Sequence, residues 1–344
     1  MARFKKASDI KVGVVGYGGA FNMGFKHLCM ARDAGMTPVA VCEIDAERLA
    51  VAEKDFPGIE TYKDLGEMLK NSAVDLVIII TPHNTHAPLA LKCLKAGRHV
   101  VVEKPLAIKT SECDAMIREA EKRDLVISTF HNRHWDGCIL EALEHIRKGE
   151  IGDVVRIECR MGNYGKPRDW WRSSKSISGG SLYDWGVHLL EYSLQILGDA
   201  KIEEVTGFVR KGLWQKDSVW KDDANEDEAQ AVVRFSGDRL LTLRVSSIEM
   251  NNKPGRTEIT GAKGAYIMDG QTYEIITHEK GQKVIRQGRN QADQQEKYYQ
   301  NVADHLARDK KLIITGEWSR RPIHILDLAY QSADKGKAIK AKYE

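Results

Sequence analysis

The chain has 344 residues, of which 52 are lysine or arginine and 49 are aspartate or glutamate, giving a net charge of +3. This length suits two domains, and the near-neutral balance gives no reason to expect nucleic acid or a membrane surface as a partner. The six cysteines form no C-x-x-C pair, and neither a membrane span nor a secretion signal is evident. We therefore expect free thiols and a cytoplasmic location.

Short apolar runs alternate with helical stretches through roughly the first third of the chain. The runs are typical of buried strands and lie at residues 11–16, 39–42, 76–80, 100–102 and 125–128. Helices are predicted up to residue 32 and at 45–55, 87–96 and 111–122. This alternation predicts a parallel sheet with helices on both faces, in which ligands bind beyond the carboxyl ends of the strands.

A glycine-rich loop follows the first strand. Gly16 permits a tight turn, and Gly18 lets backbone amides approach a pyrophosphate at the start of the next helix. The third glycine of a dinucleotide-binding fingerprint falls at Phe21, and Gly24 can replace it after a three-residue insertion. We expect cofactor contacts from Gly16, Gly18, Gly19, Ala20 and Phe21. A glycine turn that binds no dinucleotide is the alternative.

Glu43 lies at the end of the second predicted strand. A carboxylate at this point can accept hydrogen bonds from both ribose hydroxyls of a dinucleotide, and it repels a 2′-phosphate. The chain is therefore expected to bind NAD in preference to NADP.

The strand at residues 100–102 runs directly into Glu103-Lys104-Pro105. Because Lys104 leaves an apolar strand end, its ammonium is expected to be partly desolvated, which suits a group that exchanges a proton. The Lys104–Pro105 bond is a candidate cis peptide, since only X-Pro bonds adopt cis at small cost. A lysine that merely extends its stem along apolar surface is the alternative.

The second half predicts a different kind of sheet. Strand candidates lie at residues 153–160, 203–209, 229–235, 240–246, 257–260 and 265–268, and helices at 291–309 and 323–338. Successive strands with short links favour a largely antiparallel, mixed sheet. We expect an α/β chain with a Rossmann dinucleotide-binding domain over residues 1–130 and a second α/β domain over 131–344. Its last helix, at about 322–338, can pack back on the first domain.

Asp184 and His188 lie four residues apart in a helix predicted at 183–197, so both project from one face. The aspartate can orient the imidazole or bind a substrate hydroxyl, and Gly179-Gly180 lets the backbone pass close to a ligand. Together with Lys104 they can move a proton while a nicotinamide takes a hydride. The alternatives are a capping aspartate with a structural histidine, or a metal site on the i, i+4 pair. Without a clear third ligand we expect no metal.

These motifs resemble the Gfo/Idh/MocA oxidoreductases, a family that includes inositol dehydrogenases and glucose–fructose oxidoreductase. The matching segments are residues 12–18, 81–86, 96–105, 131–135 and 179–188. The resemblance implies a Rossmann domain followed by an α/β domain whose open sheet carries the substrate and commonly forms an oligomer interface. It also implies cofactor contacts from Thr81, Pro82, Asn84, His86, Glu103 and Lys104.

Other residues are candidates for the substrate site. His131 and Asn132 follow the last strand of the first domain, where they can reach the nicotinamide or the substrate, or simply form a turn. An aromatic and basic cluster before the glycines suits the C–H face and hydroxyls of a sugar, or a buried core. The expected substrate contacts are His131, Asn132, Tyr164, Trp171, Arg172, Asp184 and His188.

The sequence thus predicts an NAD-dependent dehydrogenase that acts on a secondary hydroxyl of a sugar, polyol or glycoside, as a homodimer or homotetramer. In this oligomer the second-domain sheets are expected to pair, with strand residues such as Ile157, Val232 and Leu243 facing a partner. Lys104, His188 and Asp184 are the expected catalytic residues, and the sequence leaves open whether Lys104 or His188 is the proximal base. One alternative is an NAD-dependent glycoside hydrolase that works by transient C3 oxidation and elimination. Another is a catalytically silent relative that senses NAD or sugar, which the intact Lys104, Asp184 and His188 argue against.

Overall fold

The computed structural model describes residues 2–251 and 255–342. The chain forms two compact units, the first made of Met1–His131 and Glu296–Arg320 and the second of Asn132–Gln295 and Arg321–Glu344. The segment 296–320 therefore belongs to the first unit, whereas the helix predicted at about 322–338 belongs to the second. No helix of the described residues has the length and apolar character needed to cross a membrane.

Tyrosines explain why the segment 296–320 belongs to the first unit. Helix α9 (Lys297–Arg308) buries Tyr298 and Tyr299 almost completely. The hydroxyl of Tyr298 is 2.8 Å from the Ser128 hydroxyl, and that of Tyr299 is 2.6 Å from Nδ1 of His27. These contacts join residues far apart in sequence, which no local pattern reveals.

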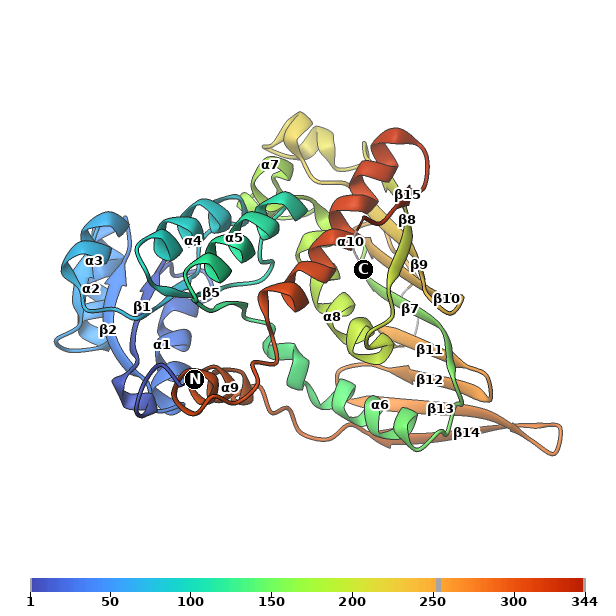
Figure 1. The fold of residues 1–344 in the computed structure, drawn as a ribbon. Coiled ribbons are helices and arrows are strands. Elements are labelled where there is room, and N and C mark those ends of the chain that lie inside the picture. Colours follow the sequence, from blue (N-terminus) through green and yellow to red (C-terminus); the bar gives the residue numbers. More distant parts are fainter. Residues whose placement is uncertain (1, 252–254, 343–344) are drawn as a thin grey trace. The chain divides into compact units, whose positions relative to one another are not determined.

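The first unit contains a six-stranded parallel sheet, as predicted (Figure 1). Its strand order is β3-β2-β1-β4-β5-β6. The strands are β1 (Lys11–Val15), β2 (Thr37–Cys42), β3 (Glu60–Tyr62), β4 (Leu76–Ile79), β5 (His99–Val102) and β6 (Ile127–Thr129). The helices before α9 are α1 (Met23–Asp33), α2 (Ala46–Asp55), α3 (Leu65–Asn71), α4 (His86–Lys95) and α5 (Thr110–Lys122). Sequence reasoning missed β3 and α3, because both are short.

The second unit is built on a nine-stranded mixed sheet of order β14-β13-β12-β11-β7-β10-β9-β8-β15, in which only β7 and β10 pair in parallel. Its strands are β7 (Val154–Gly162), β8 (Ile202–Arg210), β9 (Glu228–Phe235), β10 (Arg239–Ser246), β11 (Thr257–Gly261), β12 (Gly264–Met268), β13 (Thr272–Glu279), β14 (Gln282–Arg289) and β15 (Ile339–Lys340). Its helices are α6 (Gly137–Arg147), α7 (Lys175–Ser178), α8 (Gly186–Leu197) and most of α10 (Gly316–Lys335). The prediction missed β13 and β14, and β14 lacks an alternating buried face.

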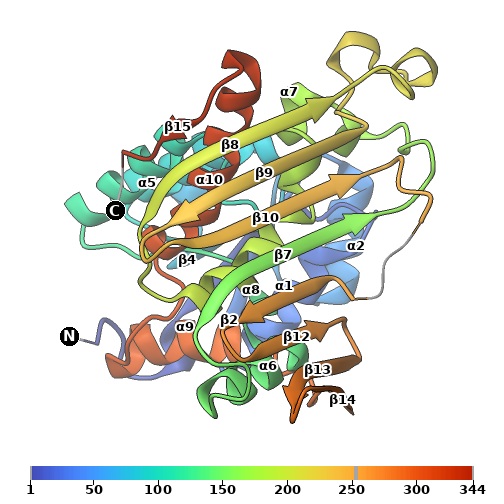
Figure 2. The same ribbon diagram turned by 90° about the vertical axis from the view of Figure 1, so that its right-hand side faces the viewer.

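Helices α6, α8 and α10 cover one face of this sheet, and Figure 2 shows the other face bare. Ile157 and Leu243, which sequence reasoning offered as residues that face a partner, are fully buried. Leu243 packs against α8, since a Cβ added to Gly186 would lie 3.1 Å from its side chain. Because side chains alternate along a strand, Val232 points the other way and is half-buried. The prediction was therefore wrong for Ile157 and Leu243.

Candidate active site

Three glycines shape the loop between β1 and α1. Gly16 has a φ of +101°, and a Cβ there would lie 2.2 Å from the carbonyl oxygen of Ile80, so only glycine fits. A Cβ on Gly18 would meet nothing within 4 Å, which leaves that stretch of backbone open to a ligand. A Cβ on Gly24 would lie 2.5 Å from the ring of Tyr17. Gly24 thus provides the close helix packing expected of the third fingerprint glycine, and Phe21 is half-exposed.

The carboxylate of Glu43 is directed at this loop. It accepts hydrogen bonds from the backbone N–H of Tyr17 at 2.6 Å and of Asp45 at 3.1 Å. Two further residues, Arg48 and Ile44, lie at the same place, and of these only Ile44 was not considered from the sequence. Arg48 donates through Nε to the Tyr17 carbonyl at 2.8 Å, and Ile44 is 86% exposed. This exposure makes Ile44 a candidate for packing on an adenine ring. In the sequence, the available signal was an isoleucine directly after Glu43, beyond the end of the predicted strand.

The remaining expected cofactor residues of the first unit follow β4. Thr81 and Pro82 are half-buried and Asn84 is exposed in the turn after the strand. His86 is fully buried, with Nε2 at 2.8 Å from the Thr81 carbonyl and Nδ1 at 2.8 Å from the Pro105 carbonyl. Burial lowers the pKa of His86, although both carbonyls oppose the shift. Its ring therefore ties this turn to the segment after β5.

Lys104 is half-buried at the carboxyl end of β5, and the predicted cis peptide to Pro105 is confirmed. Its backbone N–H donates to the Glu103 carboxylate at 2.9 Å, and the other Glu103 oxygen lies 3.1 Å from Nε2 of His27. Burial by itself raises the pKa of Glu103, but His27 and Lys104 outweigh it and the pKa falls. Sequence reasoning missed His27, which lies three residues after Gly24. Glu103 is thus held where it fixes the backbone of Lys104.

In the second unit, α8 begins at Gly186, so the prediction that Asp184 lies within this helix was wrong. Asp184 follows a single turn, Ser181–Tyr183, and its carboxylate accepts a short hydrogen bond from Nη1 of Arg172. That ion pair, between residues twelve apart in sequence, holds the carboxylate outside the helix. His188 is 7% exposed in the first turn of α8, with its ring centroid 5.6 Å from that of Trp185.

The expected aromatic and basic cluster assembles around Arg172. Its guanidinium carbon lies 5.3 Å from the Trp170 ring centroid and 5.0 Å from that of Trp171, distances at which a cation is attracted to an aromatic face. Tyr164, half-exposed, packs against Trp214 instead, with ring centroids 5.5 Å apart. His131 is buried at the end of the first unit, whereas Asn132 opens the second and donates to Gln295 at 2.6 Å.

Gly179 and Gly180 both have positive φ angles, of +89° and +128°. The backbone at Gly180 passes close to side chains of the protein itself, and the expected close approach to a ligand stays a prediction. A Cβ on Gly180 would lie 2.3 Å from the Tyr330 hydroxyl and 2.7 Å from Nζ of Lys175. This tight turn directly precedes the one that carries Asp184.

A buried ion pair supports the same turn. Nζ of Lys175 lies 2.5 Å from the carboxylate of Glu226, which also accepts from the backbone N–H of Ser181 at 3.1 Å and from the Tyr330 hydroxyl at 3.0 Å. Burial lowers the pKa of Lys175. Burial by itself raises the pKa of Glu226, but Lys175 outweighs it and the pKa falls. Neither residue was predicted, because 51 residues separate the partners.

Two family models match most of the chain. The model described as "Oxidoreductase family, NAD-binding Rossmann fold" matches residues 10–131, and "GFO/IDH/MocA C-terminal domain" matches residues 139–267. The chain belongs to the GFO/IDH/MocA oxidoreductase family. This confirms the resemblance stated from the sequence motifs.

Similar proteins include two inositol dehydrogenases. The chain is 30% identical over 199 residues to scyllo-inositol 2-dehydrogenase (NADP(+)) IolW of Bacillus subtilis, a match that covers 57% of this chain and only 54% of that protein. It is 29% identical over 281 residues to myo-inositol 2-dehydrogenase of Thermotoga maritima, covering 80% and 81%. The solved structure of levoglucosan dehydrogenase with NADH and levoglucosan superposes with a TM-score of 0.82 at 18% identity, covering 97% and 99%, which shows the same fold.

Proposed function

We propose that this family member is an NAD-dependent dehydrogenase that oxidises a secondary hydroxyl of a sugar, polyol or glycoside. The observation that carries the proposal is the arrangement at the start of α8, where His188 lies beside Trp185 and the neighbouring Asp184 is held by Arg172. A base, a carboxylate and aromatic faces are what recognition of a polyol requires. The inositol dehydrogenases among the relatives support the same substrate class.

The residues of the glycine loop fit a dinucleotide. The open backbone at Gly18 gives phosphates access to amide groups, and the Glu43 carboxylate can accept hydrogen bonds from a ribose once a ligand displaces its present partners. Bound NAD supplies the hydride acceptor. We propose that Gly16, Gly18, Gly19, Ala20, Phe21, Glu43, Thr81, Pro82, Asn84 and Arg48 form this cofactor site.

The proton chemistry is assigned to three side chains. His188, in the first turn of α8, is the side chain that accepts the proton of the substrate hydroxyl. Asp184, fixed by Arg172, accepts a hydrogen bond from a substrate hydroxyl. Lys104 donates to the reacting oxygen and stabilises the developing alkoxide. Lys104 belongs to the first unit and the other two to the second, so the proposal requires all three to reach one substrate.

The direct test is an assay of purified protein with NAD and a panel of monosaccharides, inositols and aryl glycosides, monitoring NADH absorbance and released phenol together. The proposal expects NADH to accumulate with a sugar or inositol. Phenol release without net NADH contradicts simple dehydrogenation and indicates redox-assisted glycoside cleavage. Absence of both products across the panel, with NAD bound, contradicts a catalytic role.

We also propose that the bare face of the nine-stranded sheet pairs with a second copy of the chain. An uncovered sheet face with half-buried apolar residues such as Val232 favours association. Light scattering at micromolar concentration should give a mass at least twice 38.7 kDa. A monomer mass would contradict this assembly.

A further inference from the structure

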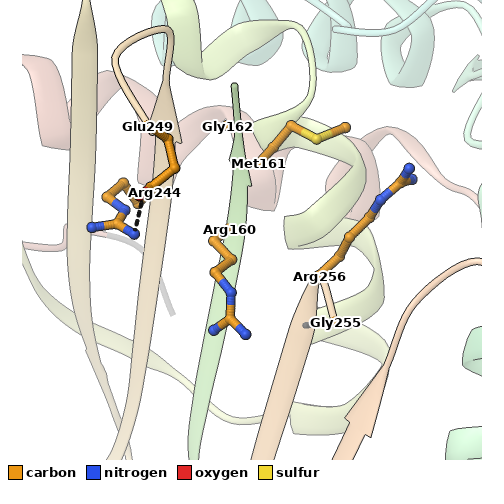
Figure 3. Close-up of a pocket in the computed structure, with 7 residues that line it drawn as sticks. All are labelled: Arg160, Met161, Gly162, Arg244, Glu249, Gly255 and Arg256. Carbon is orange, nitrogen blue, oxygen red and sulfur yellow. Dashed lines mark hydrogen bonds and ion pairs between the residues drawn. The ribbon is translucent and has the colours of Figure 1, made fainter. Parts of the chain in front are cut away.

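Three arginines and one glutamate border a cavity of about 240 Å³ in the second unit: Arg160, Arg244, Arg256 and Glu249. Figure 3 shows that the three arginine side chains extend in different directions and that Arg244 is joined to Glu249, at 2.7 Å. The cavity is therefore not a clamp in which all three arginines converge on one anion. Arg256 extends away from the other two.

Arg256 lies against the same indole as the proposed proton acceptor. Its guanidinium carbon is 5.3 Å from the ring centroid of Trp185, and the His188 ring is 5.6 Å from that ring. Trp185 directly follows Asp184 in the chain. Arg256 is exposed, so its guanidinium is open to an anion, and Trp185 is the residue that both Arg256 and His188 contact.

The carboxylates near Arg256 are engaged by other donors. Asp136 binds Arg133 at 2.9 Å. Asp269 accepts from two backbone N–H groups, and Asp293 accepts from one. These three acids and Arg256 line a second cavity of about 70 Å³. Burial by itself raises the pKa of Asp269, but its backbone hydrogen bonds outweigh it, and the charge of Arg256 adds to the lowering. Within residues 2–251 and 255–342, no carboxylate forms a direct ion pair with Arg256.

We propose that Arg256 binds an acidic group of the substrate, so that the compound oxidised is an acidic sugar with a carboxylate or phosphate away from the reacting carbon. A guanidinium presents a planar fork of N–H donors that matches either anion, and the indole face orients it. The proposal rests on the dehydrogenase function above. It restricts the substrate class from polyols in general to those that carry a negative charge.

The test compares substrates that differ only in this group. The value of kcat/KM is measured with NAD for D-glucose, D-glucuronate and D-glucose 6-phosphate, using the wild type, Arg256→Gln and Arg256→Lys. Arg244→Gln is the matched control, because Arg244 borders the same cavity but is paired with Glu249. We expect the kcat/KM of the wild type for at least one acidic sugar to exceed that for glucose by tenfold or more. Comparison of the carboxylate with the phosphate compound shows which of the two anions Arg256 binds.

Arg256→Gln should remove at least tenfold of kcat/KM for the acidic sugar and change that for glucose by less than twofold. The kcat/KM of Arg256→Lys for the acidic sugar should lie between those of the wild type and Arg256→Gln, and that of Arg244→Gln should match the wild type. The proposal is overturned if the wild type has the same kcat/KM for glucose as for the acidic sugars. It is also overturned if Arg256→Gln lowers kcat/KM equally for glucose and for the acidic sugar. If no sugar is oxidised, the dehydrogenase function fails. In that case calorimetry with glucuronate and glucose 6-phosphate on NAD-loaded protein still tests Arg256. The proposal for Arg256 is overturned if neither compound binds, or if Arg256→Gln binds them as tightly as the wild type does.

Discussion

The two halves of the proposed site are held in place by different means. In the first unit the backbone determines the geometry, through the positive φ of Gly16 and the close packing at Gly24. In the second unit, pairs of side chains distant in sequence determine it, such as Arg172 with Asp184 and Lys175 with Glu226. Backbone constraints leave a local signature in the sequence, whereas long-range pairs do not.

The largest expected effect on stability separates two glycines of the same loop. Gly16→Ala places a methyl group against the Ile80 carbonyl at a strained φ, and should lower the free energy of unfolding by about 3 kcal/mol. Gly18→Ala meets open space, so it should leave the stability of the ligand-free protein within about 0.5 kcal/mol. It should weaken NAD binding all the same. Urea unfolding measures the stability of each variant, and calorimetry measures its affinity for NAD. Equal destabilisation by Gly16→Ala and Gly18→Ala would refute the difference predicted between the two glycines.

This contrast explains what the sequence could and could not predict. The parallel sheet, the cis peptide and the role of Gly24 follow from local patterns, and the structure agrees with them. The start of α8 was misplaced because the partner of Asp184, Arg172, lies on another segment. Local periodicity carries no information about such a partner.

The second prediction concerns the ion pair behind the Gly180 turn. Glu226→Gln leaves Lys175 without its counter-charge and should cost about 2 kcal/mol of stability at pH 7, since Glu226 is buried and Lys175 is 30% exposed. Asp222→Asn, an exposed acid in the same connection, is the control. Denaturant unfolding of both variants measures the difference, and an effect of Glu226→Gln no larger than that of the control would contradict it.

The same pair has a pH dependence of known sign. Because the folded-state pKa of Glu226 lies below its ordinary value of 4.5, its contribution to stability is present above pH 4.5 and is lost as the pH falls through the folded value. The stability difference between the wild type and Glu226→Gln should therefore shrink below pH 4.5 and stay level above it. A difference that grows on acidification would show that the pair does not lower this pKa.

The smallest predicted effect is on cofactor choice. With Glu43 at the end of β2, NAD should bind at least tenfold tighter than NADP, about 1.4 kcal/mol. Glu43→Gln should reduce this preference, because the repulsion of a 2′-phosphate is removed, while Glu47→Gln in the first turn of α2 should not. Calorimetry with both dinucleotides decides the matter. Equal or tighter NADP binding by the wild type would instead assign Arg48 to the phosphate.

The central claim is the proposal that Lys104 and His188 act on a single substrate oxygen. Its most direct test is the turnover of Lys104→Met, His188→Ala and the double variant, with NAD binding measured for each. We predict that Lys104→Met nearly abolishes turnover, that His188→Ala lowers it by about 10²–10⁴-fold, and that Asp184→Asn costs less than His188→Ala. The double variant should lose far less than the product of the single losses. Turnover within about threefold of wild type in His188→Ala, or fully multiplicative losses, would contradict the account.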